Sequence, residues 1–130
     1  MNEIIISIEE ITNKKEGGHY GGYDGFRIHT TKQIIEIGIS NEQSCCEDWG
    51  YFFTNDKPKS FYGAELYKIE VVDEILQKEK LVNTYDGGIT FIDFVTSQGI
   101  LQFTMYNSHN GYYSHHGYIK SIQLNGLFTM

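Results

Sequence analysis

The fold of this chain is indicated most clearly by a hairpin sequence, Ile89-Thr90-Phe91-Ile92-Asp93-Phe94-Val95-Thr96, then Ser97-Gln98-Gly99, then Ile100-Leu101-Gln102-Phe103-Thr104-Met105-Tyr106. Two runs rich in β-branched and aromatic residues, separated by a short turn that contains glycine, predict two antiparallel strands. Side chains alternate across a strand, so Phe91 and Val95 face one way while Ile92 and Phe94 face the other. Because both faces are apolar, we expect this hairpin to lie centrally in a sheet, buried on both sides.

The same alternation recurs outward from the hairpin, broken by polar turns. Further strands are predicted at Glu3–Ile11, Phe26–Thr30, Gln33–Ser40, Ala64–Val72 and Tyr118–Leu124. The apolar positions of the first strand are Ile4, Ile6 and Ile8, and those of the fourth are Leu66, Ile69 and Val71. A turn at Thr31-Lys32 joins the second and third strands, while Glu74–Leu81 fits either two helical turns or an edge segment.

Composition supports a turn-rich β protein, with 15% aromatic residues, 14 glycines and one proline. At 130 residues the chain has the size of one ordinary domain. We therefore predict a single domain over residues 1–130 that is mainly β. Its expected form is an antiparallel sheet or sandwich-like domain of about five to seven strands with at most one short helix.

The charge of the chain disfavours one class of partner. Its formal net charge is −7, and Arg27 is its only arginine. Binding to a nucleic-acid polymer depends largely on lysine and arginine contacts to phosphates, so such a polymer is not expected. The sequence shows neither a secretory signal nor an apolar stretch of about 20 residues, so we expect no membrane association and a cytoplasmic location. If a phage encodes the chain, this location is the host cytoplasm.

A polar and aromatic stretch follows the hairpin directly, Asn107-Ser108-His109-Asn110-Gly111-Tyr112-Tyr113-Ser114-His115-His116. Asn110-Gly111 is a turn signal. Rings of tyrosine and histidine stack on bases, and amides read hydrogen-bonding edges, which is typical of a small-ligand pocket. Each histidine taken singly is also compatible with an exposed position beside a turn. We predict a pocket lined by Asn107, His109, Asn110, Tyr112, Tyr113 and His115.

A second polar segment leads into the only tryptophan, in Cys45-Cys46-Glu47-Asp48-Trp49-Gly50-Tyr51. Trp49 is expected to anchor the core or a hinge, and Trp49 and Glu47 are expected to lie near the pocket. The glycine-rich segment Gly17–Gly25 is a candidate to close over it, or else a surface loop. Adjacent cysteines lack the spacing of a zinc pair, so the default role of Cys45 and Cys46 is structural. No cofactor, metal or catalytic residue is predicted.

Several motifs resemble an uncharacterised family of small proteins from phages and prophages of Gram-positive bacteria. They are SCCE-x-WGY within Ile39–Tyr51 and YN-x-HNGYY-x-H within Tyr106–His115, with supporting matches at Phe61–Leu66, Gly87–Phe91 and Leu101–Phe103. The resemblance runs from about Gly25 to His115, and Ser114 departs from it where glycine is expected. It implies a phage context, in which accessory genes of this size often act in counter-defence, and it supplies no catalytic residues.

Three classes of function compete. The first, which we favour, is a non-enzymatic counter-defence protein that sequesters a small nucleotide-derived immune signal, such as a cyclic nucleotide or an ADP-ribose derivative. The second is an acidic inhibitor that binds a host defence protein, in the manner of an anti-CRISPR protein. The third is an enzyme, either one that degrades a small nucleotide through His109 or His115 or a Cys/His zinc enzyme. A sheet this aromatic also predicts a homo-oligomer, because it is expected to leave an edge or face for a partner.

Overall fold

The computed structural model describes residues 2–14, 22–41, 48–72, 88–108 and 116–129. Over these residues the chain is almost entirely β-strand, which confirms the mainly β prediction, with nine strands instead of five to seven. The only helical element among them is the short 3-10 helix η1, Pro58–Phe61. The strands are β1 Glu3–Lys14, β2 Tyr23–Thr30, β3 Ile34–Ser40, β4 Asp48–Phe53, β5 Glu65–Val72, β6 Gly88–Thr96, β7 Gly99–Ser108, β8 His116–Lys120 and β9 Asn125–Thr129.

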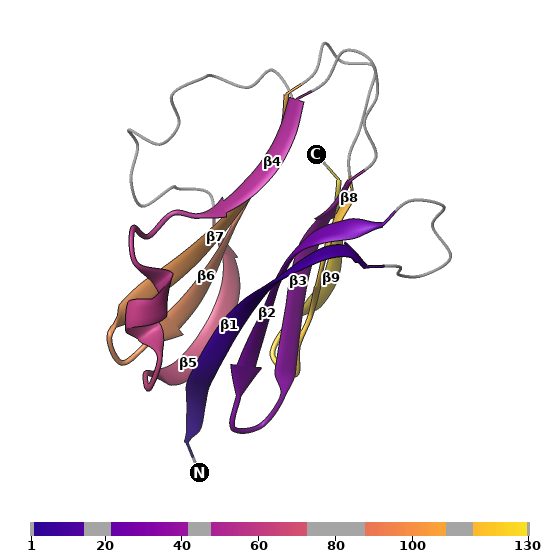
Figure 1. Ribbon diagram of the computed structural model, residues 1–130. Helices are drawn as coiled ribbons and strands as arrows, with labels where there is room; N and C mark the ends of the chain where they lie inside the picture. The colour runs from indigo at the N-terminus through magenta and orange to yellow at the C-terminus, as the bar shows by residue number, and fades with distance from the viewer. Residues whose placement is uncertain (1, 15–21, 42–47, 73–87, 109–115, 130) are drawn as a thin grey trace.

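The nine strands form one open sheet in the order β4-β7-β6-β5-β1-β2-β3-β8-β9. Every neighbouring pair in it is antiparallel. The sheet folds over on itself, so that the half made of β4, β7, β6 and β5 faces the half made of β1, β2, β3, β8 and β9 (Figure 1). We call these the first and second half-sheets. The arrangement is sandwich-like, as predicted, and β1 joins the two half-sheets through its short pairing with β5.

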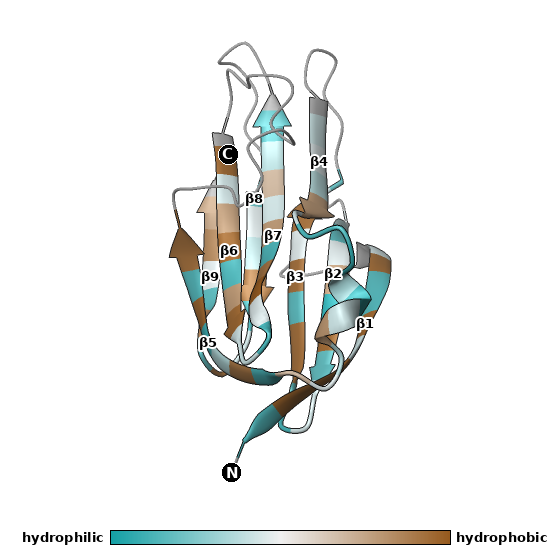
Figure 2. Cartoon of the chain, turned by 90° about the vertical axis from the view of Figure 1, so that its left-hand side faces the viewer, coloured by the Kyte–Doolittle hydropathy of each residue, from teal (hydrophilic) through white to brown (hydrophobic). Residues whose placement is uncertain are grey.

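The core lies between the two half-sheets. Hydrophobic and hydrophilic residues alternate along the strands (Figure 2), so that each half-sheet turns one apolar face inward. Phe26 of β2 touches Phe53 of β4 and Phe103 of β7, with ring centroids 4.5 and 5.9 Å apart. The two faces are therefore in direct aromatic contact. Buried members of the core include Ile28, Ile35, Ile37 and Ile39 from the second half-sheet and Ile92, Phe94, Leu101 and Phe103 from the first.

The predicted hairpin is confirmed as β6 and β7, and both of its faces are buried, although β7 lies next to the edge strand β4 and not at the centre of the sheet. Its outer face is less apolar than expected, because Asp93, Gln102 and Thr104 lie there. Their buried side chains bind one another: Gln102 Nε2 donates to Asp93 Oδ1 at 2.7 Å, and Thr54 Oγ1 donates to Gln102 Oε1 at 3.0 Å. Burial raises the pKa of Asp93, the Gln102 bond lowers it, and nearby Glu70 raises it further. Such hydrogen bonding offsets the cost of burying polar groups.

Register shifts occur in β1 and β5, and the one in β1 overturns part of the predicted face of that strand. The ladder between β1 and β2 shifts between Ile5 and Ser7, so Ile5 is fully buried while Ile6, an expected core position, is 54% exposed. In β5 the shift lies between Leu66 and Lys68, and the predicted positions Leu66 and Ile69 are buried, whereas Val71, which lies opposite Ile92, is 48% exposed. A bulge adds one residue to a strand and turns the following side chains to the other face, which simple alternation does not anticipate.

The predicted final strand Tyr118–Leu124 is confirmed only as far as Lys120, where β8 ends and a tight turn leads to β9. Side-chain to backbone bonds close this turn: Ser121 Oγ donates to the Leu124 carbonyl at 2.7 Å, and Leu124 N donates to Ser121 Oγ at 2.8 Å. Strand β4 was not predicted. The hairpin of β2 and β3, with its turn at Thr31-Lys32, is confirmed. Glu74–Leu81 lies outside the described residues.

The two ends of the sandwich differ in their connections. At one, which we call the turn end, short turns join β2 to β3, β6 to β7 and β8 to β9, beside the start of β1 (Figure 1, bottom). The other, the connection end, carries the strand ends to which residues 15–21, 42–47, 73–87 and 109–115 are joined: Lys14, Tyr23, Ser40, Asp48, Val72, Gly88, Ser108 and His116. The described chain has no helix long and apolar enough to span a bilayer.

Candidate functional site

Two of the predicted ligand residues meet at the connection end. Trp49 of β4 and Asn107 of β7 are directly opposite each other in the ladder, so their side chains share a face. That face is the inner one, since Phe53 and Phe103 follow on it. Asn107 is fully buried, and Trp49 packs against the core. Trp49 therefore has the anchoring position expected of it and also adjoins the predicted pocket segment.

The remaining predicted ligand residues lie outside the described residues: Glu47, His109, Asn110, Tyr112, Tyr113 and His115. The same holds for Cys45, Cys46 and most of the Gly17–Gly25 segment. The structure does describe the strand ends to which the six predicted ligand residues are joined. Among them, Asp48 pairs with Ser108. The Glu47 segment and the His109–His115 segment are thus joined to neighbouring strand ends.

The glycine of the Trp49-Gly50-Tyr51 motif has a packing role. Gly50 lies opposite Tyr106, and a β-carbon at position 50 would collide with the Tyr106 hydroxyl. Only glycine lets the Tyr106 ring lie over β4 there. Phe52, the next residue on this outer face, also contacts the Tyr106 ring, with centroids 6.4 Å apart. The motif therefore fixes which residues of β4 point inward, namely Trp49 and Tyr51.

The second half-sheet turns polar groups toward the same end of the interior. Asp24 of β2 is on the inner face, because it precedes Phe26 and Ile28 in the alternation. Asn41, just after β3, donates from Nδ2 to Asp24 Oδ1 at 3.1 Å, and its Oδ1 accepts from Gly22 N at 3.2 Å. Asn41 N also donates to the Gly22 carbonyl at 3.0 Å. These bonds hold a carboxylate and an amide at the point where the chain enters β2 and leaves β3.

Tyr51 links the two half-sheets. Its hydroxyl donates to Glu10 Oε2 of β1 at 2.8 Å. Burial raises the pKa of Tyr51, and the hydrogen bond and charge of Glu10 and the charge of Asp24 raise it further. The phenol is therefore neutral at physiological pH and remains a donor to Glu10. Asp24, Glu10, Asn41, Tyr51, Trp49 and Asn107 together form the candidate site.

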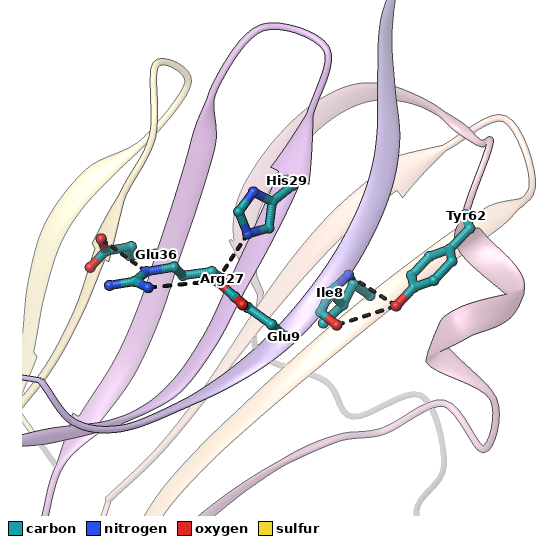
Figure 3. Close-up of polar contacts among 6 residues, drawn as sticks. All are labelled: Ile8, Glu9, Arg27, His29, Glu36 and Tyr62. Atoms are coloured by element: carbon teal, nitrogen blue, oxygen red, sulfur yellow. Dashed lines mark hydrogen bonds and ion pairs between the residues drawn. The ribbon is translucent and has the colours of Figure 1, made fainter.

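The only arginine is committed elsewhere, on the outer face of the second half-sheet. Arg27 lies between two carboxylates, Glu9 and Glu36, each 3.5 Å away, and His29 Nε2 is 3.0 Å from the same Glu9 oxygen (Figure 3). The His29 hydrogen bond is the main cause of the lowered pKa of Glu9. Arg27 thus belongs to a cross-strand network of charged side chains on the outer face and does not face the candidate site.

Sequence reasoning missed Glu10, Asp24, Asn41 and Tyr51. A signal for Asp24 was present, because extending the alternation of Phe26 and Ile28 back by two residues places it on the core face. No signal tied Glu10 to Tyr51, since their meeting depends on how the sheet folds over. Among the described residues there is no group of three or more His, Cys, Asp or Glu side chains that could hold a metal ion.

The fold and the site define a β-sandwich with a polar, partly acidic end. Residues 1–119 match the family model DUF7448, described as a domain of unknown function, and the chain belongs to this family. The match ends within β8. No curated protein and no solved structure matches the chain.

Proposed function

We propose that this protein is a non-enzymatic binding module that captures a small nucleotide-derived ligand at the connection end. The observation that carries the proposal is the cross-strand pair Trp49 and Asn107, which lies at the same end of the interior as Asp24 and Asn41 of the facing half-sheet. Binding residues are commonly carried on connections that a rigid sheet holds in place. Here the pair lies at the strand ends that bear the predicted ligand residues Glu47, His109, Asn110, Tyr112, Tyr113 and His115.

The charges of the site favour one orientation of the ligand. Carboxylates at Asp24 and Glu10 accept hydrogen bonds from amino and hydroxyl groups but repel phosphate. The only arginine of the chain, Arg27, is engaged by Glu9 and Glu36 on the outer face. The base and ribose of the ligand therefore face the site, and its phosphates point to solvent. This orientation predicts that a free nucleoside retains most of the affinity.

The biological role that fits this chemistry is sequestration of an immune signal in a phage-type counter-defence. Its support is the resemblance of the SCCE-x-WGY and YN-x-HNGYY-x-H motifs to small phage proteins. The neutral, donating Tyr51 also favours binding over catalysis, because a phenol with a raised pKa is a poor general base. The protein would act in the host cytoplasm by keeping the signal from its receptor.

The experiment incubates purified protein with cyclic nucleotides, ADP-ribose and adenosine, measures binding by calorimetry, and identifies the ligand after heat release. Release of unaltered ligand is the expected result. A chemically altered ligand would show an enzyme instead, and a failure to bind any of these compounds would favour the protein-binding inhibitor.

Replacing Asp24 tests the site itself. Asp24→Asn should weaken adenosine binding about tenfold, since one hydrogen bond to a charged group contributes about 1.5 kcal/mol. Asp56→Asn is the matched control, because it makes the same change at an exposed position after β4. Equal affinities of the two variants would place the ligand elsewhere.

A further inference from the structure

The last strand leaves one edge of the sheet open. Strand β9 ends the strand order, and among the described residues it pairs with β8 alone. In the described part of the chain, strand β1 also has a free edge, beyond the two residues that pair with β5, but a side chain covers part of it. There the Tyr62 hydroxyl accepts from Ile8 N at 3.0 Å and donates to the Ile8 carbonyl at 3.2 Å (Figure 3). Tyr62 thus occupies the very groups through which another strand would pair.

The other outer strand, β4, is tied back to the sheet by the Tyr51 bond to Glu10 and begins with an acidic residue, Asp48. Strand β9 has neither feature. Natural edge strands usually carry charges or proline that prevent pairing with another chain. The segment from Ser121 to Met130 contains no Asp, Glu, Lys, Arg or Pro, although the chain has a net charge of −7.

Two large apolar side chains of this segment are exposed. Leu127, in the middle of the strand, is 76% exposed, and Ile122 in the preceding turn is 73% exposed. Leu127 lies opposite Tyr118 on the outer face of the second half-sheet. The uncharged strip formed by β9 and the Ser121–Leu124 turn offers no charge to an acidic partner or a nucleic acid, and the lysine beside it, Lys120 of β8, lies opposite Asn125 at one end of β9. A second copy of the chain would offer an identical uncharged strip. Pairing through this strip avoids repulsion between two chains that each carry a net charge of −7.

We infer that β9 is a homodimer interface, in which two copies pair their β9 strands antiparallel about a two-fold axis. Strand β9 has five residues, so all of them pair when Leu127 lies opposite its own copy. The two sheets then continue into one another, and the exposed Leu127 side chains contact each other across the axis. This inference does not depend on the proposed ligand.

Two variants that introduce opposite charges at position 127 test the two-fold symmetry. Wild-type protein should have twice the monomer mass by sedimentation or light scattering at micromolar concentration. Leu127→Lys and Leu127→Glu should each be monomeric, because the axis brings like charges together in both cases. An equimolar mixture of the two variants should dimerise again. Val71→Lys and Val71→Glu, which place the same charges at an exposed position on β5, should remain dimeric.

A strictly monomeric wild type would overturn the inference. So would dimers that persist in both Leu127 variants, since the contact would then lie elsewhere. Folded Leu127 variants that fail to associate when mixed would exclude pairing centred on Leu127. Circular dichroism of each variant checks that the β structure is retained.

Discussion

The turn end and the connection end of the sandwich use polar residues in opposite ways. At the turn end, buried Glu3 accepts three hydrogen bonds, from Thr30 Oγ1 at 2.6 Å, Gln33 Nε2 at 2.7 Å and Gln123 Nε2 at 2.6 Å. Gln33 Nε2 also donates to Gln123 Oε1 at 2.7 Å, and Ile122 N donates to Gln33 Oε1 at 2.8 Å. One carboxylate thus joins the start of β1 to two turns that are far apart in the sequence.

At the connection end, the polar groups of Asp24, Asn41 and Asn107 lie beside long connections instead of short turns. The two ends of the strands therefore have different roles. The turn end fastens the start of β1 and the β8–β9 turn to the β2–β3 turn and stabilises the sheet. The connection end places amides and carboxylates where the predicted ligand residues are attached, so changes there should affect binding more than folding.

The largest effect is expected from removing the carboxylate of the turn end. Glu3→Ala removes a buried carboxylate that accepts three hydrogen bonds, which should lower the free energy of unfolding by about 3 kcal/mol. Urea unfolding followed by fluorescence measures this loss. Glu65→Ala, which removes the same charge from a half-buried site at the same end, should cost less than about 1 kcal/mol. Equal losses for the two variants would contradict the stabilising role of the Glu3 network.

A smaller loss of stability is expected at the connection end. Asn41→Ala removes the bonds to Asp24 and Gly22, and should lower the free energy of unfolding by about 1 kcal/mol. The same variant should weaken adenosine binding, because Asp24 loses the residue that positions it. A stability loss as large as that of Glu3→Ala, measured in the same assay, would remove the distinction between the two ends.

The smallest effect is expected from Tyr51→Phe, and it depends on pH. The variant loses the bond to exposed Glu10, so at neutral pH the free energy of unfolding should fall by about 0.5 kcal/mol. The folded-state pKa of Tyr51 is raised, so its stabilising contribution is full below the unfolded value near 10 and is lost as pH rises above it.

Urea unfolding of wild type and Tyr51→Phe from pH 7 to 11 should therefore give a constant difference up to about pH 9 and a shrinking one beyond pH 10. Tyr67→Phe, at an exposed tyrosine of β5, is the control and should show no such pH dependence. A difference that grows at alkaline pH would mean that the folded state stabilises the phenolate.

The strands in which apolar and polar residues alternate regularly could be predicted from the sequence. The pairs β2–β3 and β6–β7 follow it closely, and both hairpins were predicted. Strand β9 was missed because Asn125-Gly126 has the form of a hairpin turn, although the turn lies at Ser121–Leu124. Strand β4 was missed because Trp49-Gly50-Tyr51-Phe52-Phe53 has no polar alternation. The bulge in β1 leaves no pattern in a single sequence.

Only one side of the candidate site was predicted from the sequence. Trp49 and Asn107 were chosen from local composition, and their strands proved to be neighbours. Glu10, Asp24 and Asn41 come from the facing half-sheet, and their approach depends on how the sheet folds over between β5 and β1. Such long-range geometry is set by the packing of the whole core, which local periodicity does not encode.

The most direct test of the two-ended account is a titration of adenosine into isotopically labelled protein, followed through the backbone amide signals. The account predicts shifts for Gly22, Asn41, Trp49 and Asn107 at the connection end. The amides of Thr30, Gln33, Ser121 and Gln98 at the turn end should stay unchanged. Shifts confined to the turn end, or no shifts at ligand concentrations in the millimolar range, would contradict the placement of function at the connection end.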